Sequence, residues 1–530
     1  MTILVRRTGR QQLARSLFRD IHNVNDYFYV FTSRAQPWTD DALPETPVDS
    51  QAYMQQYKRD MLFVKKIGSA DTVLLTKRYD WATGTVYDQY DDSYSSAYQS
   101  NSGATNLADA NFYVMTDDFN VYKCLDNNSN VASTVEPTAT GTETFELSDG
   151  YVWKFMYQIG AADRTKFLSA AFMPVRKVAG TGNPSFDVNG SLDSISVTAG
   201  GSGYSNATVV ITGDGTGATA NATISGNAIT AITLTSAGLG YSFAIVEITG
   251  NGTGATATAV LGSTETPSLQ QAVESTAVSG TIDRILVTAG GQDYIQGDVV
   301  VLINGDGTGA TGSATVDAAG TITAVNVTAP GSGYTFATVT LTQTVGSGTG
   351  CTLRAIVSPY EGHGGNPPKE LFASNVGITT SLTSTNDDII IGNEFRQIGL
   401  IKNIQNYTEN ALFTQSTGTP CFIITVDNPA AYNLDDIITV TSGGRFRVIQ
   451  KLDTNNDGTI ETVYLQEILP GITVGGTFNN VNTGVTGMTI NSLTSPEMSV
   501  HSGDVMYIDN RKPITRDADQ VETVKVIFNF

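Results

Sequence analysis

The chain has 530 residues, with 51 Asp and Glu against 30 Lys and Arg and a formal net charge of −21. Such an acidic chain is a poor candidate for nucleic-acid binding, because Lys and Arg side chains supply the affinity for phosphate backbones. Only 15% of the residues are charged and 53 are Gly, a composition that favours β-strands and turns over a helical bundle.

Residues 1–90 are predicted to be the N-terminal α/β part of a body, and residues 91–180 a β-rich domain. Thr8 and Gln11 have the spacing of a capping box ahead of an apolar stripe, which predicts a first helix. A second helix is predicted from Gln51 to Lys65, capped by Asp49 or Ser50. The polar run from 90 to 110 predicts an exposed loop, and residues 112–157 read as strands.

Residues 181–357 are predicted to be an inserted tandem array of about four small β-units. Each unit has a Gly-Tyr element followed by a G-x-G-T-G element, and the runs between them alternate in polarity. The repeated tyrosines are Tyr204, Tyr241, Tyr294 and Tyr334. Each ring could stack on a sugar at the surface, or could pack over a neighbouring strand; we favour packing. The region contains two cationic residues, Arg284 and Arg354.

Residues 358–530 are predicted to be a C-terminal β-rich part that packs back on the N-terminal body. Strands are indicated at 422–426, 437–440, 446–449 and 463–469, and the chain ends in an alternating segment that predicts a docked strand. The whole chain is therefore expected to be mainly β with minor α, as an α+β body. We expect several domains, with antiparallel sheets or sandwiches and an insertion of Gly-rich β-repeats.

The motifs that could carry chemistry are weak. Gly307, Gly309 and Gly312 have dinucleotide-loop spacing, but a strand-like segment follows where a helix is required, so we interpret them as a turn. Asp453, Asn455 and Asp457 match the first half of a calcium loop. The carboxylate expected at its last position is missing, and we favour a plain β-hairpin over a calcium site.

The remaining residue types indicate no active site. Three histidines are scattered without ligand spacing, and three cysteines lie too far apart in sequence to indicate a disulfide framework or a metal pair. No apolar run reaches the ~18 residues of a transmembrane helix. We therefore expect no enzymatic activity, no catalytic residue, no further metal site, no cofactor and no insertion into a membrane.

Several strings outside the repeats resemble a known family. They are Ser33–Trp38, Tyr122–Asp126, Asp149–Trp153, His501–Arg511 with Pro513 and Ile514, and the closing strand to Phe530. Together they resemble the dimeric baseplate wedge subunit of contractile-tailed bacteriophages, the myoviruses. The resemblance covers roughly residues 1–180 and 360–530, and the last thirty residues are its most specific part. The repeat array has no counterpart in shorter members, so it looks like an insertion.

The resemblance implies a structural protein of the virion. Family members pair as homodimers in each wedge around the tail hub, contact other baseplate wedge proteins and help hold the baseplate before contraction. It also implies assembly in the host cytoplasm and residence in the tail baseplate. Interface candidates of suitable chemical type are Arg34, Pro37, Trp38, Tyr151, Tyr507 and Arg511.

Two other functions stay open at this point. The first is a glycan-binding tail adhesin, in which the Gly/Tyr repeats bind surface glycans through avidity. The repeats could also contact an additional baseplate protein. The second is a polysaccharide-degrading tail enzyme, which would need two convergent carboxylates across a cleft; the acidic residues of the array fall mostly in predicted turns.

Overall fold

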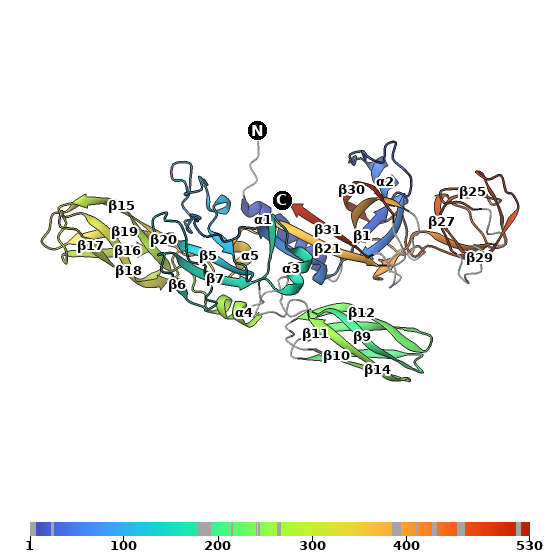
Figure 1. Cartoon of the computed structure of the whole chain (residues 1–530), viewed down its shortest axis with the longest axis horizontal. Helices are drawn as coiled ribbons and strands as arrows, with labels where there is room; N and C mark the ends of the chain where they lie inside the picture. The colour runs from blue at the N-terminus through green and yellow to red at the C-terminus, as the bar shows by residue number, and fades with distance from the viewer. Residues whose placement is uncertain are drawn as a thin grey trace. The chain divides into compact units, whose positions relative to one another are not determined.

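The computed structural model (Figure 1) describes residues 7–22, 26–177, 192–213, 216–239, 241, 244–261, 267–383, 394–408, 411–426, 432–452, 462–515 and 521–530. The predicted fold class is confirmed, because the chain is mainly β with few helices and its sheets are antiparallel. The chain divides into two compact units. Unit 1 is Met1–Ser16, Val73–Gly377 and Ile527–Phe530, and unit 2 is Leu17–Thr72 and Ile378–Val526.

Unit 2 is built around a five-stranded sheet that combines segments from both ends of the chain. Its order is β23-β2-β1-β22-β30, with β1 Phe28–Ser33, β2 Met61–Lys66, β22 Phe395–Lys402, β23 Thr417–Gly418 and β30 Asp504–Ile514. Central strand β1 is buried along its whole length, as its continuous apolar run requires. Val30 lies opposite Leu400, so residues 370 positions apart share one ladder.

The second predicted helix is shorter than expected. Helix α2 spans Gln51–Arg59, and Ser50 caps it by accepting a hydrogen bond from the Tyr53 amide. The chain then enters β2, so the predicted helix end at Lys65 is wrong. Met61 and Leu62 fit a helical stripe, but they begin a run of four buried residues that pairs with β1. Strand pairing in the core thus outweighs the local helical pattern.

A closed six-stranded barrel completes unit 2. Its order is β24-β27-β26-β25-β28-β29, with β24 Phe422–Val426, β25 Ile437–Val440, β26 Arg445–Leu452, β27 Thr462–Leu469, β28 Thr477–Asn480 and β29 Met488–Thr494. The four strands predicted between 422 and 469 are confirmed. Alternating inward residues such as Ile424, Phe446 and Leu465 fill the barrel.

The body of unit 1 is a four-stranded sheet in the order β4-β5-β7-β6. Its strands are β4 Tyr113–Met115, β5 Asn120–Asp126, β6 Thr144–Glu146 and β7 Val152–Gln158. The smaller elements are α3 Ala161–Phe167, α4 Pro267–Thr276, α5 Pro367–Glu370, the 3₁₀ turns Ser69–Asp71 and Leu107–Asp109, and strand β8 Phe172–Val175. Boundaries between the units fall inside α1 Arg7–His22, β3 Thr72–Lys77, β21 Asn375–Thr383 and β31 Val521–Asn529.

The four repeats form two modules of identical topology. Module 1 (residues 192–261) has the sheets β11-β12-β9-β14 and β10-β13, and module 2 (residues 282–357) has β17-β18-β15-β20 and β16-β19. The strands are β9 Leu192–Ser202, β10 Ala207–Gly213, β11 Thr216–Ser225, β12 Ala228–Leu239, β13 Ala244–Gly250, β14 Thr253–Leu261, β15 Ile282–Gln292, β16 Val299–Gly305, β17 Thr308–Val316, β18 Ile322–Ser332, β19 Ala337–Gln343 and β20 Thr349–Val357.

Within each module, every strand pair joins the first repeat to the second. In module 1, β11 pairs with β12, β9 with β14 and β10 with β13. A single repeat therefore contains strands but no sheet, because each of its strands finds its partner in the other repeat. The folding unit is the intertwined pair of repeats.

Candidate functional surfaces

The family-like strings near residues 34 and 511 meet in unit 2. The indole Nε1–H of Trp38 donates to the carbonyl oxygen of Arg511 at 2.8 Å, although 473 positions separate them. The Arg34 guanidinium lies 3.9 Å from the centre of the Trp38 ring and donates to the carbonyl oxygen of Pro37 at 3.2 Å. Four predicted interface residues thus form one cluster within the chain.

An ion pair fixes this loop to the five-stranded sheet. Arg396 on β22 donates to both carboxylate oxygens of Asp41 at 2.9 Å, and to the carbonyl oxygen of Ala35 at 2.6 Å. The hydrogen bonds from Arg396 are the main reason that the pKa of Asp41 falls to about 2. A two-point guanidinium–carboxylate contact also fixes orientation, so the loop is held in one arrangement.

The interface candidates differ in their accessibility. Trp38 keeps only 7% of its surface exposed, so its side chain supports the loop more than it offers contact area. Tyr151 is fully buried, stacks on Trp153 with ring centres 5.5 Å apart, and donates to the carbonyl oxygen of Val131. Its side chain belongs to the core of unit 1, which corrects its prediction as an interface residue. Tyr507 is half-buried, and Arg511 is exposed beside Asp509.

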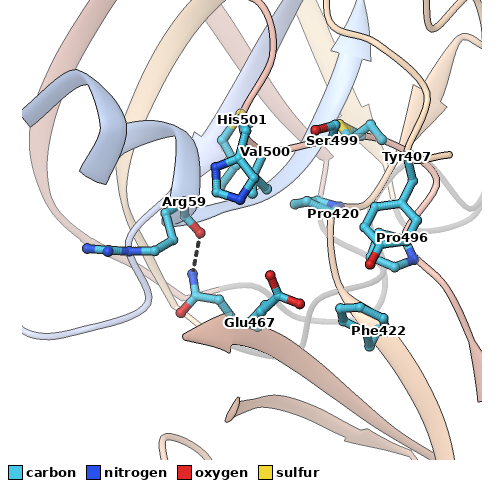
Figure 2. A pocket seen from close by; sticks show the side chains of 12 residues that line it. Arg59, Tyr407, Pro420, Phe422, Glu467, Pro496, Ser499, Val500 and His501 are labelled. Carbon is cyan, nitrogen blue, oxygen red and sulfur yellow. Dashed lines mark hydrogen bonds between the residues drawn. The ribbon is translucent and has the colours of Figure 1, made fainter. Parts of the chain in front are cut away.

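A pocket of unit 2 opens between the end of α2, the barrel and the segment 496–501 (Figure 2). Its wall is mostly apolar, with Tyr407, Phe422 and Met498, and it also includes Glu467 and His501. Burial raises the pKa of Glu467, while the nearby His501 opposes that rise. Sequence reasoning missed this pocket because its lining comes from five separated segments.

The pocket does not have the geometry of an acyl-transfer site. Ser499 also lines it. Among the residues that the structure describes, however, no hydrogen bond joins the side chains of Ser499, His501 and Glu467. A serine nucleophile needs a base within hydrogen-bond reach, and that base needs an orienting partner.

The four repeat tyrosines pack inside the modules. Their exposed fractions are 3% for Tyr204 and Tyr241, 8% for Tyr294 and 4% for Tyr334. An added Cβ at Gly252 would lie 2.4 Å from the Tyr204 ring, and one at Gly307 would lie 2.4 Å from the Tyr334 ring. Because each of these glycines lacks a side chain, a tyrosine ring can pack directly against its backbone. Packing is confirmed, and these buried rings cannot stack on a sugar.

Module 2 is docked on the body of unit 1 through the two cations of the repeat region. Arg354 donates to both carboxylate oxygens of Asp91 at 2.8 Å, and its guanidinium lies 4.5 Å from the centre of the Tyr98 ring. Arg284 donates to the carbonyl oxygen of Tyr90 at 2.9 Å. The loop predicted to be exposed therefore contributes a buried carboxylate, since Asp91 is 0% exposed. The expectation of a fully exposed loop is wrong.

Further buried polar groups lie beneath the same junction. Lys123 on β5 donates to Glu370 on α5 at 2.6 Å, and both side chains are almost completely buried. His363 contacts Asp283 of β15 through Nε2 at 2.6 Å. Burial lowers the pKa of His363 although Asp283 opposes the shift. The first pair joins β5 to α5, and the second joins the segment before α5 to module 2; all four side chains are at most 13% exposed.

The other predicted motifs do not come together as a catalytic or metal site. Gly307 lies in the bend before strand β17, whereas Gly309 and Gly312 lie inside that strand, so the interpretation of the whole run as a turn is wrong beyond its first residue. A strand follows where a dinucleotide loop requires a helix. Within the described ranges, no group of three His, Cys, Asp or Glu residues could hold a metal ion. Asp453, Asn455 and Asp457 lie outside the described residues. Burial raises the pKa of all three cysteine thiols, that of Cys421 to about 11, which disfavours the reactive thiolate.

The chain matches no family model, and no curated protein matches its sequence. In the part of the chain that the structure describes, no helix is long and apolar enough to cross a membrane.

Proposed function

We propose that this chain is a non-enzymatic structural component of a contractile phage tail baseplate wedge. In this proposal it forms a homodimer, links neighbouring wedge proteins and helps hold the baseplate before contraction. Its place is the tail baseplate of the virion.

The observation that carries the proposal is the contact between Trp38 and Arg511. These residues belong to two separate strings of the family resemblance, and the sheet that combines residues 28–66 with 395–514 brings them within hydrogen-bonding distance. A random likeness of short strings would not require them to meet. Two separate strings of the resemblance therefore meet in one three-dimensional cluster, which supports the proposal.

The physical character of unit 2 also supports a scaffold. Its loop and sheet are locked by Arg396 and Asp41, so a partner would meet a preformed surface. Preformed surfaces bind with a smaller loss of conformational entropy. The strongly negative charge of the chain suppresses non-specific association, which suits an ordered assembly pathway.

Light scattering of the purified chain at micromolar concentration tests the homodimer in this proposal. We expect a particle of twice the chain mass of 56.2 kDa. A strictly monomeric particle would count against the proposal.

A further inference from the structure

Helix α2 and the segment that leads into it leave an uncovered face on unit 2. Leu43, Val48 and Tyr53 are 75%, 43% and 41% exposed. On the helix itself, Ala52, Gln55 and Arg59 are also exposed. Residues three, four or seven positions apart lie on one side of a helix, so Ala52, Gln55 and Arg59 share one side of α2. The exposed Leu43 and Val48 belong to the segment that leads into the helix.

This surface is held in place before any partner arrives. At one end Asp41 is bound by Arg396, and at the other the amide of Val48 donates to the hydroxyl of Tyr57 at 2.9 Å. Ser50 then caps α2. Since the segment between these anchors is short, little conformational freedom would be lost on binding.

The charges on this surface are separated along the helix. From Asp40 to Tyr57 the chain has four acidic residues and no Lys or Arg, and Lys58 and Arg59 follow at the helix end. Lys58 is buried and donates to the carbonyl oxygen of Gly503. The Arg59 side chain is 51% exposed and lies 4.0 Å from a carboxylate oxygen of Asp60, whose side chain is 18% exposed. Figure 2 shows its guanidinium directed away from Glu467 and the pocket. The exposed carboxylates thus gather at the N-terminal end, and the most exposed charge at the C-terminal end is the Arg59 guanidinium.

Such a surface is complementary to a second copy of itself. A two-fold axis perpendicular to α2 places two helices antiparallel, so that Asp49 of each copy approaches Arg59 of the other. The nine-residue helix is about 13 Å long, and antiparallel helices also bring opposite dipole ends together. The apolar segment of each copy then lies toward the helix end where the partner's pocket opens, with its Tyr407 and Phe422 side chains.

We propose that the face formed by α2 and residues 43–48 is the homodimer interface, with reciprocal Asp49–Arg59 contacts. This inference rests on the proposed dimer and specifies which surface makes it. It also assigns the negative charge before α2 a role in partner choice, because like charges placed opposite each other disfavour association.

Charge exchange in the full-length chain tests the proposal. Sedimentation equilibrium would measure the dimer dissociation constant of wild type, Asp49→Lys, Arg59→Asp and the double variant. Each single change places like charges opposite each other twice, so we expect the dissociation constant to rise roughly 10- to 100-fold. The double variant restores opposite charges in reversed order and should return to within about threefold of wild type. Glu247→Lys, at an exposed position of module 1, is the matched control and should leave the constant unchanged.

The outcomes separate this inference from the proposed function. Thermal unfolding of each variant verifies folding, and both side chains are exposed enough for charge reversal to be tolerated. If wild type is dimeric and the single variants dimerise equally well, α2 is not the interface although the dimer remains. Failure of the double variant to recover also overturns the reciprocal contact. A monomeric wild type would instead contradict the proposed function itself.

Discussion

Modules 1 and 2 share a fold but differ in how they are attached. In both modules, tyrosine rings pack directly against glycines. Both modules also have cross-strand threonine pairs, Thr198 with Thr256 and Thr288 with Thr352. Module 2 is docked through Arg284 and Arg354, whereas residues 192–261 contain no Lys, Arg or His. In the described part of module 1, side-chain hydrogen bonds have both partners inside the module.

The comparison distinguishes the residues that determine the fold of a module from the residues that attach the module to its neighbour. The Gly and Tyr positions recur in both modules because the sandwich requires them. The cations occur only where a module must contact another surface. A second molecule recognising module 1 would therefore meet a surface without positive charge.

Replacing a buried repeat tyrosine should have the largest effect on stability. The effect should be equal in the two modules. Tyr204→Ala and Tyr334→Ala should each destabilise their own module by about 3–5 kcal/mol, because a buried ring is replaced by a cavity. Hydrogen exchange measured separately for residues 192–261 and 282–357 would show the loss. Tyr→Phe at the same positions is the control and should have little effect. Unchanged exchange protection in the alanine variants would contradict the packing role.

Removing the docking cation should distinguish the modules. Arg354→Met removes the cationic partner of the buried Asp91, which keeps hydrogen bonds from Ser93 and Tyr98, so we expect stability to fall by about 2–3 kcal/mol. The expected loss of stability is smaller than is usual when a fully buried ion pair is broken, because 27% of the Arg354 side chain is exposed. Limited proteolysis should show faster cleavage within residues 88–112, with module 1 unaffected. Glu247→Gln is the matched control, and equal cleavage of both variants would exclude the docking role.

Adding a methyl group beneath a repeat tyrosine ring should have a smaller effect on stability. Gly252→Ala and Gly307→Ala place a Cβ 2.4 Å from a tyrosine ring, and the forced repacking should cost about 1–3 kcal/mol. Gly141→Ala is the comparison, because nothing lies within 4 Å of its added Cβ and its φ is not positive. Calorimetry should show a larger loss of stability for each of the two ring-site variants than for Gly141→Ala.

The smallest effect concerns acid stability. Asp306 accepts hydrogen bonds from the Thr335 hydroxyl and the Thr335 and Phe336 amides, which lower its pKa to about 2. In module 1, Asn251 accepts the corresponding bonds from Ser205 and Asn206. Since the folded state favours the charged form of Asp306, its contribution is present above pH ~4 and is lost as the pH falls toward 2.

Asp306→Asn should therefore flatten the dependence of module 2 stability on pH between ~4 and 2. Melting temperatures of wild type and variant, recorded across that range, would measure the change. Equal slopes would show that the carboxylate charge at this turn does not contribute to stability.

The repeats and the C-terminal strands were predictable because their signals are local. Alternation and turn glycines locate each strand, and the Tyr positions follow from the repeat. The pairing of repeats into modules was not predictable, because a strand pattern does not specify its partner. The end of α2 was missed for a related reason, since Met61 and Leu62 satisfy both a helical stripe and a buried strand.

The candidate surfaces were predictable only in part. The resemblance identified Arg34, Trp38 and Arg511, and the structure brings them together. The docking of Arg354 on Asp91 could not be anticipated from spacing, because 263 positions separate the two residues. The uncovered face of α2 required knowledge of which side chains the sheet leaves exposed.

The most direct test of the central claim is a cryo-electron microscopy map of contractile tails assembled in cells that carry this gene. We expect density for the chain in pairs, in each wedge around the tail hub. Tails that contain no density for this chain, or that contain it only as single copies away from the baseplate, would contradict the proposed function.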